Sequence, residues 1–282
     1  MKNVPELESP SKDYSSITTG KAHSSAKRLS FKDLVYEEKD SCAWITMNRP
    51  EVRNALSKQM FSDLTKSIAK ASRDPKIQFL AITGSGDSFS AGLDIKQVHE
   101  FASKTEAKNF VYKLVGPFWN QMLDIEKPIL AVVDGPAYGA GAEIVLASDI
   151  VIASSRSKFA FSGGRVGALC CISPIIGPMV MEGRRVIEMN LTANPLTAEE
   201  AKEVGLVTNV VPPEEVRTKA SEVVDHLRHV SPISNSSFKR IRKEMIPKPA
   251  LARAYRELFR TITSPDFNKG ATAFLNKERA TF

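Results

Sequence analysis

One acid follows a run of small residues in the segment at residues 131–147. The segment reads Ala-Val-Val-Asp-Gly-Pro-Ala-Tyr-Gly-Ala-Gly-Ala-Glu-Ile-Val-Leu-Ala, which is typical of an apolar strand, a tight turn and the start of a helix. A helix that begins near Gly139 leaves its first backbone N–H groups unpaired, with its positive dipole end directed outward, so an oxyanion is stabilised there. Glu143 lies one turn further along. We therefore expect an anion-binding turn with Glu143 beside it as a proton acceptor.

A second bend that contains glycine occurs at residues 89–96, which read Phe-Ser-Ala-Gly-Leu-Asp-Ile-Lys. It follows an apolar strand expected at residues 77–83 and precedes a helix. Two such bends can supply two backbone N–H donors to one carbonyl oxygen. Turns of this kind also occur without chemistry, where the small residues only let a helix pack closely on a strand.

Short β-type runs alternate with helical stretches and predict an α/β fold. The expected strands lie at residues 34–48, 77–83, 129–134 and 149–153, and the first long helices at 57–72 and 105–123. The helices expected in the C-terminal part lie at residues 214–229, 233–245, 250–262 and 266–277. The first thirty residues are rich in Ser and Lys and are predicted to form a polar tail.

The composition predicts one ordinary globular enzyme domain. The chain has 282 residues, of which 42% are hydrophobic and 25% charged. It contains no apolar run near the roughly 20 residues of a membrane helix, and its start lacks an apolar signal core, so we expect a cytoplasmic protein without a membrane partner. Its three cysteines form no disulfide framework, and no Cys/His spacing suggests a metal.

Four motifs occur together in this chain. Besides the two bends, residues 48–56 read Asn-Arg-Pro-Glu-Val-Arg-Asn-Ala-Leu and residues 273–279 read Ala-Phe-Leu-Asn-Lys-Glu-Arg. In this order and at these separations, they resemble the enoyl-CoA hydratase/isomerase family, also called the crotonase family, over about residues 31 to 282.

The resemblance implies a fold and an assembly. Residues 31–212 would form a crotonase-like spiral of repeated ββα units, residues 213–282 a C-terminal helical trimerisation region, and residues 1–30 the polar tail. It implies a homotrimer or hexamer and an acyl-CoA thioester substrate, with no cofactor other than the coenzyme A of the substrate. A net charge of +7 suits the phosphates of CoA, and nucleic acid is an unlikely partner.

The resemblance also assigns roles to residues of this sequence. The backbone N–H groups of Leu93 and Ala140 would form the oxyanion hole, and Glu143 matches the first of two catalytic glutamates. The residues expected to bind the substrate or its CoA are Arg53, Ala55, Leu56, Ala91, Asp94, Ile95, Lys96, Gly139 and Gly163. For Asp94, a structural role in holding the oxyanion loop is the favoured interpretation.

The chain departs from the family where the second glutamate is expected. Aligning the flanking Phe159 and Gly167 puts Gly163 at that position, and no Asp or Glu occurs between residues 150 and 181. Restoring the acid by Gly163→Glu is predicted to raise hydration if the pocket has room. The candidates to replace the missing acid are Ser162, Arg165, Tyr138, Cys170 and Cys171.

The sequence therefore predicts an acyl-CoA enzyme that stabilises a thioester enolate, with enoyl-CoA hydration as the first hypothesis. Double-bond isomerisation, decarboxylation and thioester hydrolysis remain alternatives. A weakly active acyl-CoA-binding protein is a further alternative, because only one glutamate of the pair is present.

Overall fold

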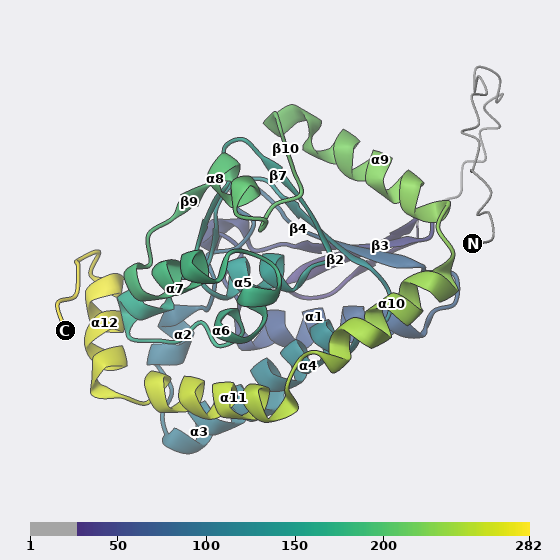
Figure 1. Ribbon diagram of the computed structural model, residues 1–282. Coiled ribbons are helices and arrows are strands. Elements are labelled where there is room, and N and C mark those ends of the chain that lie inside the picture. The colour runs from purple at the N-terminus through teal and green to yellow at the C-terminus, as the bar shows by residue number, and fades with distance from the viewer. Residues whose placement is uncertain (1–26) are drawn as a thin grey trace, which may run out of the picture.

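A seven-stranded mixed sheet runs through the centre of the protein, whose computed structural model describes residues 27–282 (Figure 1). The strands are β1 (Lys27–Ser30), β2 (Leu34–Lys39), β3 (Cys42–Met47), β4 (Phe79–Gly84), β5 (Ile129–Val133), β7 (Ile150–Ser154) and β10 (Asn209–Val211), in the order β1-β2-β3-β4-β5-β7-β10. The β1–β2 and β2–β3 pairs are antiparallel and the rest are parallel. The α/β class expected from the sequence is confirmed.

The polar tail expected at residues 1–30 is shorter than its predicted boundary. Its last four residues form β1, which pairs with β2 from Lys27 opposite Glu38 to Ser30 opposite Val35. A short polar edge strand carries little apolar signal, because its residues are paired on one side only and Arg28, Leu29 and Ser30 remain exposed. Residues 1–26 lie outside the described residues.

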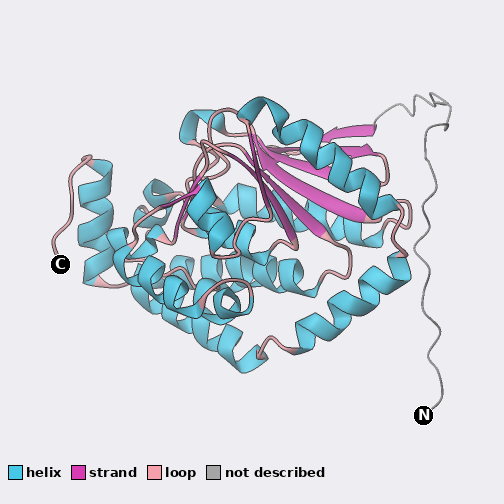
Figure 2. Cartoon of the chain, turned by 45° about the horizontal axis from the view of Figure 1, so that its top comes forward, coloured by secondary structure: helices cyan, strands magenta, loops and turns pink. Residues whose placement is uncertain are grey.

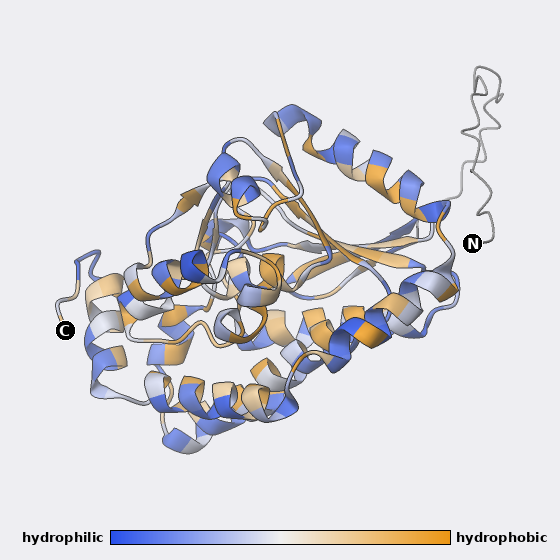
Figure 3. Cartoon of the chain, in the orientation of Figure 1, coloured by the Kyte–Doolittle hydropathy of each residue, from blue (hydrophilic) through white to orange (hydrophobic). Residues whose placement is uncertain are grey.

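The central strands are covered on both faces. All five residues of β5 are buried, as expected for a parallel strand between two layers of helices. One face packs against α1 (Lys58–Arg73) and the main core, whereas the other carries Phe79, Leu130 and Ile152, which pack against α9 (Val216–Arg228). Figure 2 shows the strands as a fan with helices around it, and Figure 3 shows the apolar strands between helices with one polar side.

The helices between β4 and β7 follow the two bends seen in the sequence. The first bend leads into α2 (Ile95–His99), and the second leads through β6 (Ala137–Tyr138) into α5 (Ala140–Ala147). Between them, α3 (Lys104–Phe110), the π-helical turn η2 (Val111–Val115) and α4 (Gly116–Asp124) follow one another without a break. This arrangement confirms the long helix expected at residues 105–123.

A smaller sheet and several short helices surround the second bend. The sheet contains β6, β8 (Lys158–Ala160) and β9 (Leu196–Thr197). The short helices of this region are η3 (Ser162–Val166), α6 (Ser173–Ile176), α7 (Gly183–Thr192) and α8 (Ala198–Glu203).

The C-terminal part is helical, with α9, α10 (Pro232–Glu244), α11 (Lys248–Ile262) and α12 (Pro265–Leu275). In Figure 1, α11 runs along the bottom of the molecule and α12 stands beside α2 and α7 at the left. A buried ion pair fixes α10, because Asp149 accepts hydrogen bonds from Lys239 Nζ at 2.6 Å and from Arg242 at 3.0 Å. The basic run at residues 239–243 is thus partly neutralised within the fold. No helix in residues 27–282 has the length and apolar character needed to cross a bilayer.

Candidate active site

The two bends lie side by side and are joined through their backbones. Ser90 forms a parallel bridge with Ala137, and the Tyr138 N–H donates to the Ser90 carbonyl at 2.9 Å. From the other direction, the N–H groups of Phe89 and Ser90 both donate to the carbonyl of Pro136. Residues 48 positions apart are therefore held at a fixed separation by main-chain atoms alone.

The closeness of the bends depends on glycine. Gly92 has a φ of +87°, and a Cβ added to it would lie 2.6 Å from the Tyr138 carbonyl oxygen and 3.2 Å from the Ala140 nitrogen. A Cβ on Gly141 would lie 2.7 Å from the Ser90 carbonyl oxygen. A side chain at either position would push the bends apart, because such distances are shorter than any relaxed contact.

The backbone N–H group of Leu93 points away from Leu56, whose backbone supports the first bend. Leu56 donates its N–H to the Gly92 carbonyl at 2.7 Å and accepts from the Asp94 N–H at 3.2 Å, so it bonds to the residues on both sides of Leu93. Because successive peptide groups of an extended segment face opposite directions, the N–H of Leu93 faces the other side.

Ala140 supplies the second free donor, because it is the first residue of α5 and follows Gly139, which has a φ of +54°. Within residues 27–282, neither the Leu93 nor the Ala140 N–H donates a backbone hydrogen bond. The two groups and the dipole of α5 can therefore stabilise one oxyanion.

Asp94 holds the first bend in place. It caps α2 by accepting from the Gln97 N–H at 3.3 Å, and its other oxygen accepts from Arg49 at 3.0 Å. The same Arg49 nitrogen donates to the Ala55 carbonyl at 2.9 Å. These contacts support the structural interpretation of Asp94. Arg49 lies within one of the sequence motifs but was not predicted as a site residue, since an arginine near the surface gives no signal of its partners.

Glu143 is buried in the first turn of α5, with 2% of its surface exposed. Its Oε1 accepts hydrogen bonds from the backbone N–H groups of Ile172 at 2.5 Å and Ser173 at 2.9 Å. Burial raises the pKa of Glu143 to about 8, and the two N–H donors oppose this shift. In the described part of the chain, Oε2 accepts no hydrogen bond, so this oxygen is free to exchange a proton with a bound molecule.

The loop that supplies these donors is anchored from α7. The Ser173 hydroxyl donates to Asn190 Oδ1 at 2.8 Å, and Asn190 Nδ2 donates in turn to the Val186 carbonyl at 2.9 Å. Sequence reasoning missed Ile172, Ser173 and Asn190, because the donors are main-chain atoms far along the chain from Glu143. No residue type signals such a contact.

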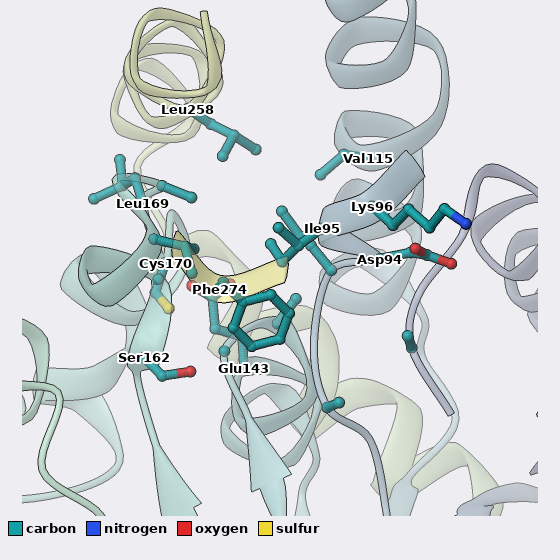
Figure 4. A pocket seen from close by; sticks show the side chains of 18 of the residues that line it. Asp94, Ile95, Lys96, Val115, Glu143, Ser162, Leu169, Cys170, Leu258 and Phe274 are labelled. Atoms are coloured by element: carbon teal, nitrogen blue, oxygen red, sulfur yellow. The ribbon is translucent and has the colours of Figure 1, made fainter. Parts of the chain in front are cut away.

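A cavity of about 380 Å³ opens in front of the free donors and Glu143. The predicted site residues that line it are Arg53, Ala55, Ala91, Leu93, Asp94, Ile95, Lys96, Gly139, Ala140, Glu143 and Gly163. Leu56 does not line it, because its side chain is fully buried and its backbone supports the first bend. In Figure 4, Leu169, Cys170 and Ser162 lie on one side of the cavity, opposite Ile95, Asp94 and Lys96. The inner walls are apolar, with Phe61, Val115, Trp119 and Leu258.

The position of the missing second acid is tightly packed. A Cβ added to Gly163 would lie 3.1 Å from both the Ala168 carbonyl oxygen and the Cys170 nitrogen. The acids that line the cavity in the described residues are Glu51, Asp94 and Glu143, of which Asp94 is already bound by Arg49.

The structure places only some of the candidates to replace that acid at the cavity. Ser162, Cys170 and Cys171 line the cavity, whereas Arg165 and Tyr138 are not part of its lining. Among residues 27–282, no group of three or more His, Cys, Asp or Glu side chains is arranged to hold a metal ion.

Comparison with known proteins gives consistent results. Residues 37–282 match the family model described as enoyl-CoA hydratase/isomerase. The enoyl-CoA hydratase EchA19 of Mycobacterium tuberculosis is 30% identical, over 89% of this chain and 96% of that protein. The peroxisomal enoyl-CoA delta isomerase 3 of Mus musculus is 33% identical, over 84% of this chain and 74% of its own length. The crystal structure of an enoyl-CoA hydratase from Mycobacterium avium subsp. paratuberculosis superposes with a TM-score of 0.76 at 27% identity, covering 90% of this chain and 99% of that one. The crotonase fold expected from the motifs is confirmed.

Proposed function

Because this chain belongs to the enoyl-CoA hydratase/isomerase family, we propose that it is an enzyme that acts on an acyl-CoA thioester through an enolate. The thioester oxygen binds between the N–H groups of Leu93 and Ala140. Negative charge develops on that oxygen when a proton leaves the acyl chain, and fixed donors at this point lower the barrier. Support comes from two free N–H groups that main-chain bonds hold side by side at the cavity.

The reaction that this site supports best is a shift of the double bond between positions 3 and 2 of the acyl chain. Glu143 Oε2 removes a proton from the carbon next to the double bond, the electron pair moves through the chain to the thioester oxygen, and the enolate is then reprotonated at another carbon. The observation that carries this proposal is that Glu143 is the buried carboxyl among the three that line the cavity in residues 27–282, and its Oε2 accepts no hydrogen bond there. Such a shift needs a base beside an oxyanion hole and no bound water.

Hydration is the second candidate, and the names of relatives such as the M. tuberculosis protein favour it. It needs a water held at the β carbon, a base for that water and an acid for the α carbon. Here the walls near Glu143 offer Ser162 and two thiols in place of a second carboxyl.

Binding of the CoA moiety and assembly are parts of the same proposal. Arg53 and Lys96 line the cavity and would pair with CoA phosphates, and the head of Lys96 points away from the cavity interior in Figure 4. A homotrimer, alone or doubled into a hexamer, would cover the apolar side chains exposed on α10 and at its C-terminal cap: Ile233, Phe238, Ile241 and Met245. Light scattering tests this, and a monomer at micromolar concentration would contradict it.

The deciding experiment is to incubate the purified full-length protein with 3-enoyl-CoA, 2-enoyl-CoA and saturated acyl-CoA esters and to follow the products by mass spectrometry and NMR. Isomerisation leaves the mass unchanged and moves the olefinic protons, whereas hydration adds one water. Release of free CoA would indicate hydrolysis, and loss of carbon dioxide from a malonyl-type ester would indicate decarboxylation. Binding of every ester without any conversion would favour the binding protein.

A further inference from the structure

Cys170 lies in the part of the cavity wall that packs tightly against Gly163, the position expected to carry a second acid. Its nitrogen is one of the two atoms that a Cβ on Gly163 would meet at 3.1 Å. The side chain is 5% exposed, and Cys170 lines the same cavity as Glu143 and Gly163. Figure 4 shows it on the same side of the cavity as Ser162. The loop at residues 168–171 thus comes close to the glycine and brings a thiol with it.

The surroundings of this thiol keep it protonated. Burial raises the pKa of the Cys170 thiol well above its usual value, the charge of Glu143 raises it further, and the backbone of Gly163 opposes the shift. A neutral thiol costs less to bury in an apolar wall than a second carboxylate beside Glu143 would. It is a proton donor available to a strongly basic carbon.

We propose that Cys170 is the second catalytic residue of this site and donates the proton that completes the double-bond shift at the γ carbon of the acyl chain. The inference rests on the proposed function, in which Glu143 first removes a proton and leaves an enolate. The S–H bond of Cys170 then breaks while a C–H bond forms at the γ carbon, as the electron pair of the enolate returns from the thioester oxygen and the double bond forms between carbons 2 and 3. When the product leaves, protonated Glu143 returns its proton to solvent and the Cys170 thiolate regains one from solvent, so the enzyme is restored.

The identity of the residue follows from the contacts of the three polar candidates. The Ser162 hydroxyl is a far weaker acid than a thiol. Cys171 also lines the cavity, but the three atoms nearest to a Cβ on Gly163 belong to residues 168–170. Cys170 is therefore the thiol on the segment that packs against the position of the missing acid.

The test compares Cys170→Ala and Cys170→Ser with Cys42→Ala. Cys42 is equally buried but lies on the opposite face of the sheet, against α9, and controls for loss of a core thiol. With a 3-enoyl-CoA substrate, both Cys170 variants should lose about 10²-fold in kcat, the lower end for loss of a positioned acid, with the Kd of the ester within twofold of the wild-type value. Cys42→Ala should keep kcat within threefold.

The source of the hydrogen that is added to the product distinguishes a catalytic role of Cys170 from a structural one. In D₂O under single-turnover conditions, the wild-type product should carry deuterium at the γ carbon. The residual product of Cys170→Ala should instead carry hydrogen from the substrate, because Glu143 then returns the proton that it removed. If the alanine variant does not fold, the same deuterium measurement is made on Cys170→Ser.

Two outcomes would overturn the inference. One is a wild-type product whose new hydrogen at the γ carbon comes from the substrate, and the other is a Cys170→Ser variant with wild-type kcat. If Glu143→Gln is inactive in the same assay, the proposed function still stands and only the role of Cys170 fails. If Glu143→Gln and both Cys170 variants all keep wild-type rates, the proposed function itself fails.

Discussion

The two walls of the cavity differ in which atoms perform the chemistry. In the proposed mechanism, main-chain N–H groups act on the oxyanion side, which we call the main-chain wall, and the side chains of Leu93 and Ala140 contribute little beyond allowing the turns. On the opposite side, which we call the acid wall, the side chain of Glu143 acts, and Gly163 and Cys170 lie close together where a second acid was expected from the sequence.

This difference indicates how the reaction can change while the fold stays the same. The main-chain wall depends on glycines at positions where any Cβ would collide with backbone atoms of the other bend, so few other residues can be accommodated there. The acid wall depends on side chains at the ends of a loop and can be altered one residue at a time. In the proposed mechanism, substrate activation therefore depends on main-chain geometry, and proton delivery depends on individual side chains.

The largest effect should come from Glu143→Gln. Turnover of the best ester should fall by about 10²–10⁴-fold, because the base is lost while shape and main-chain donors remain. Binding of the ester, measured by calorimetry, should stay within a few-fold, because Gln Oε1 can still accept from Ile172 and Ser173. An unchanged rate would show that proton transfer does not depend on Glu143 or on the acid wall.

The next largest effect should come from Gly92→Ala, which tests the main-chain wall. The added methyl group would meet the Tyr138 carbonyl and spread the bends, so Leu93 and Ala140 could no longer bind one oxygen together. Loss of one oxyanion donor costs about 10²–10³-fold in kcat.

Gly183→Ala is the matched control, because a Cβ there has no heavy atom within 4 Å and the variant should behave as wild type. A Gly92→Ala enzyme that is folded by circular dichroism and fully active would show that the bends tolerate separation and that their spacing does not matter.

The main-chain wall could be predicted from the sequence, and the acid wall only in part. Small residues between an apolar strand and a helix have few structural uses, so Gly139 to Glu143 and Gly92 to Asp94 predicted the bends and their donors. The helices and strands also follow from apolar periodicity, with α1, β5 and the continuous run from α3 to α4 within a few residues of their expected limits.

The rest of the site depends on contacts between segments far apart in the chain. The sequence indicated that Gly163 lacks a carboxyl group, but it gave no sign that residues 168–170 fill the space around it. The donors to Glu143 are the main-chain N–H groups of Ile172 and Ser173, whose side chains carry no information about them. Leu56 was predicted to contact the substrate, yet its backbone supports the first bend, since the motif alone cannot separate contact from support.

The pH dependence of the rate should distinguish the two walls, because Glu143 titrates and the main-chain N–H groups do not. We expect an effect of intermediate size. With the pKa of Glu143 raised to about 8 by burial, the carboxylate form that acts as base is the minor form at neutral pH. The value of kcat/KM should therefore fall about tenfold for each pH unit below 8 and level off above it. Ester binding should change little over pH 6–9. A flat rate profile from pH 6 to 9 would contradict a raised pKa for the base.

The smallest effect, and the sharpest test of the acid wall, should come from a single methyl group at Gly163. The Cβ of Gly163→Ala would lie 3.1 Å from the Ala168 oxygen and the Cys170 nitrogen, so the loop must shift by a few tenths of an ångström. Overpacking of this kind costs about 1–3 kcal/mol, and we expect that loss in urea unfolding with a rate lowered by less than about tenfold. Gly164→Ala is the matched control, since its nearest neighbour would be the Asn190 carbonyl oxygen at 3.9 Å and neither stability nor rate should change.

Gly163→Glu adds the same strain with a longer side chain, so it should lower every rate. This reverses the expectation from sequence alone that restoring the acid raises hydration. If Gly163→Glu instead hydrates crotonyl-CoA faster than wild type, the loop yields easily, and the acid wall lacks only a carboxyl group rather than being built around a thiol.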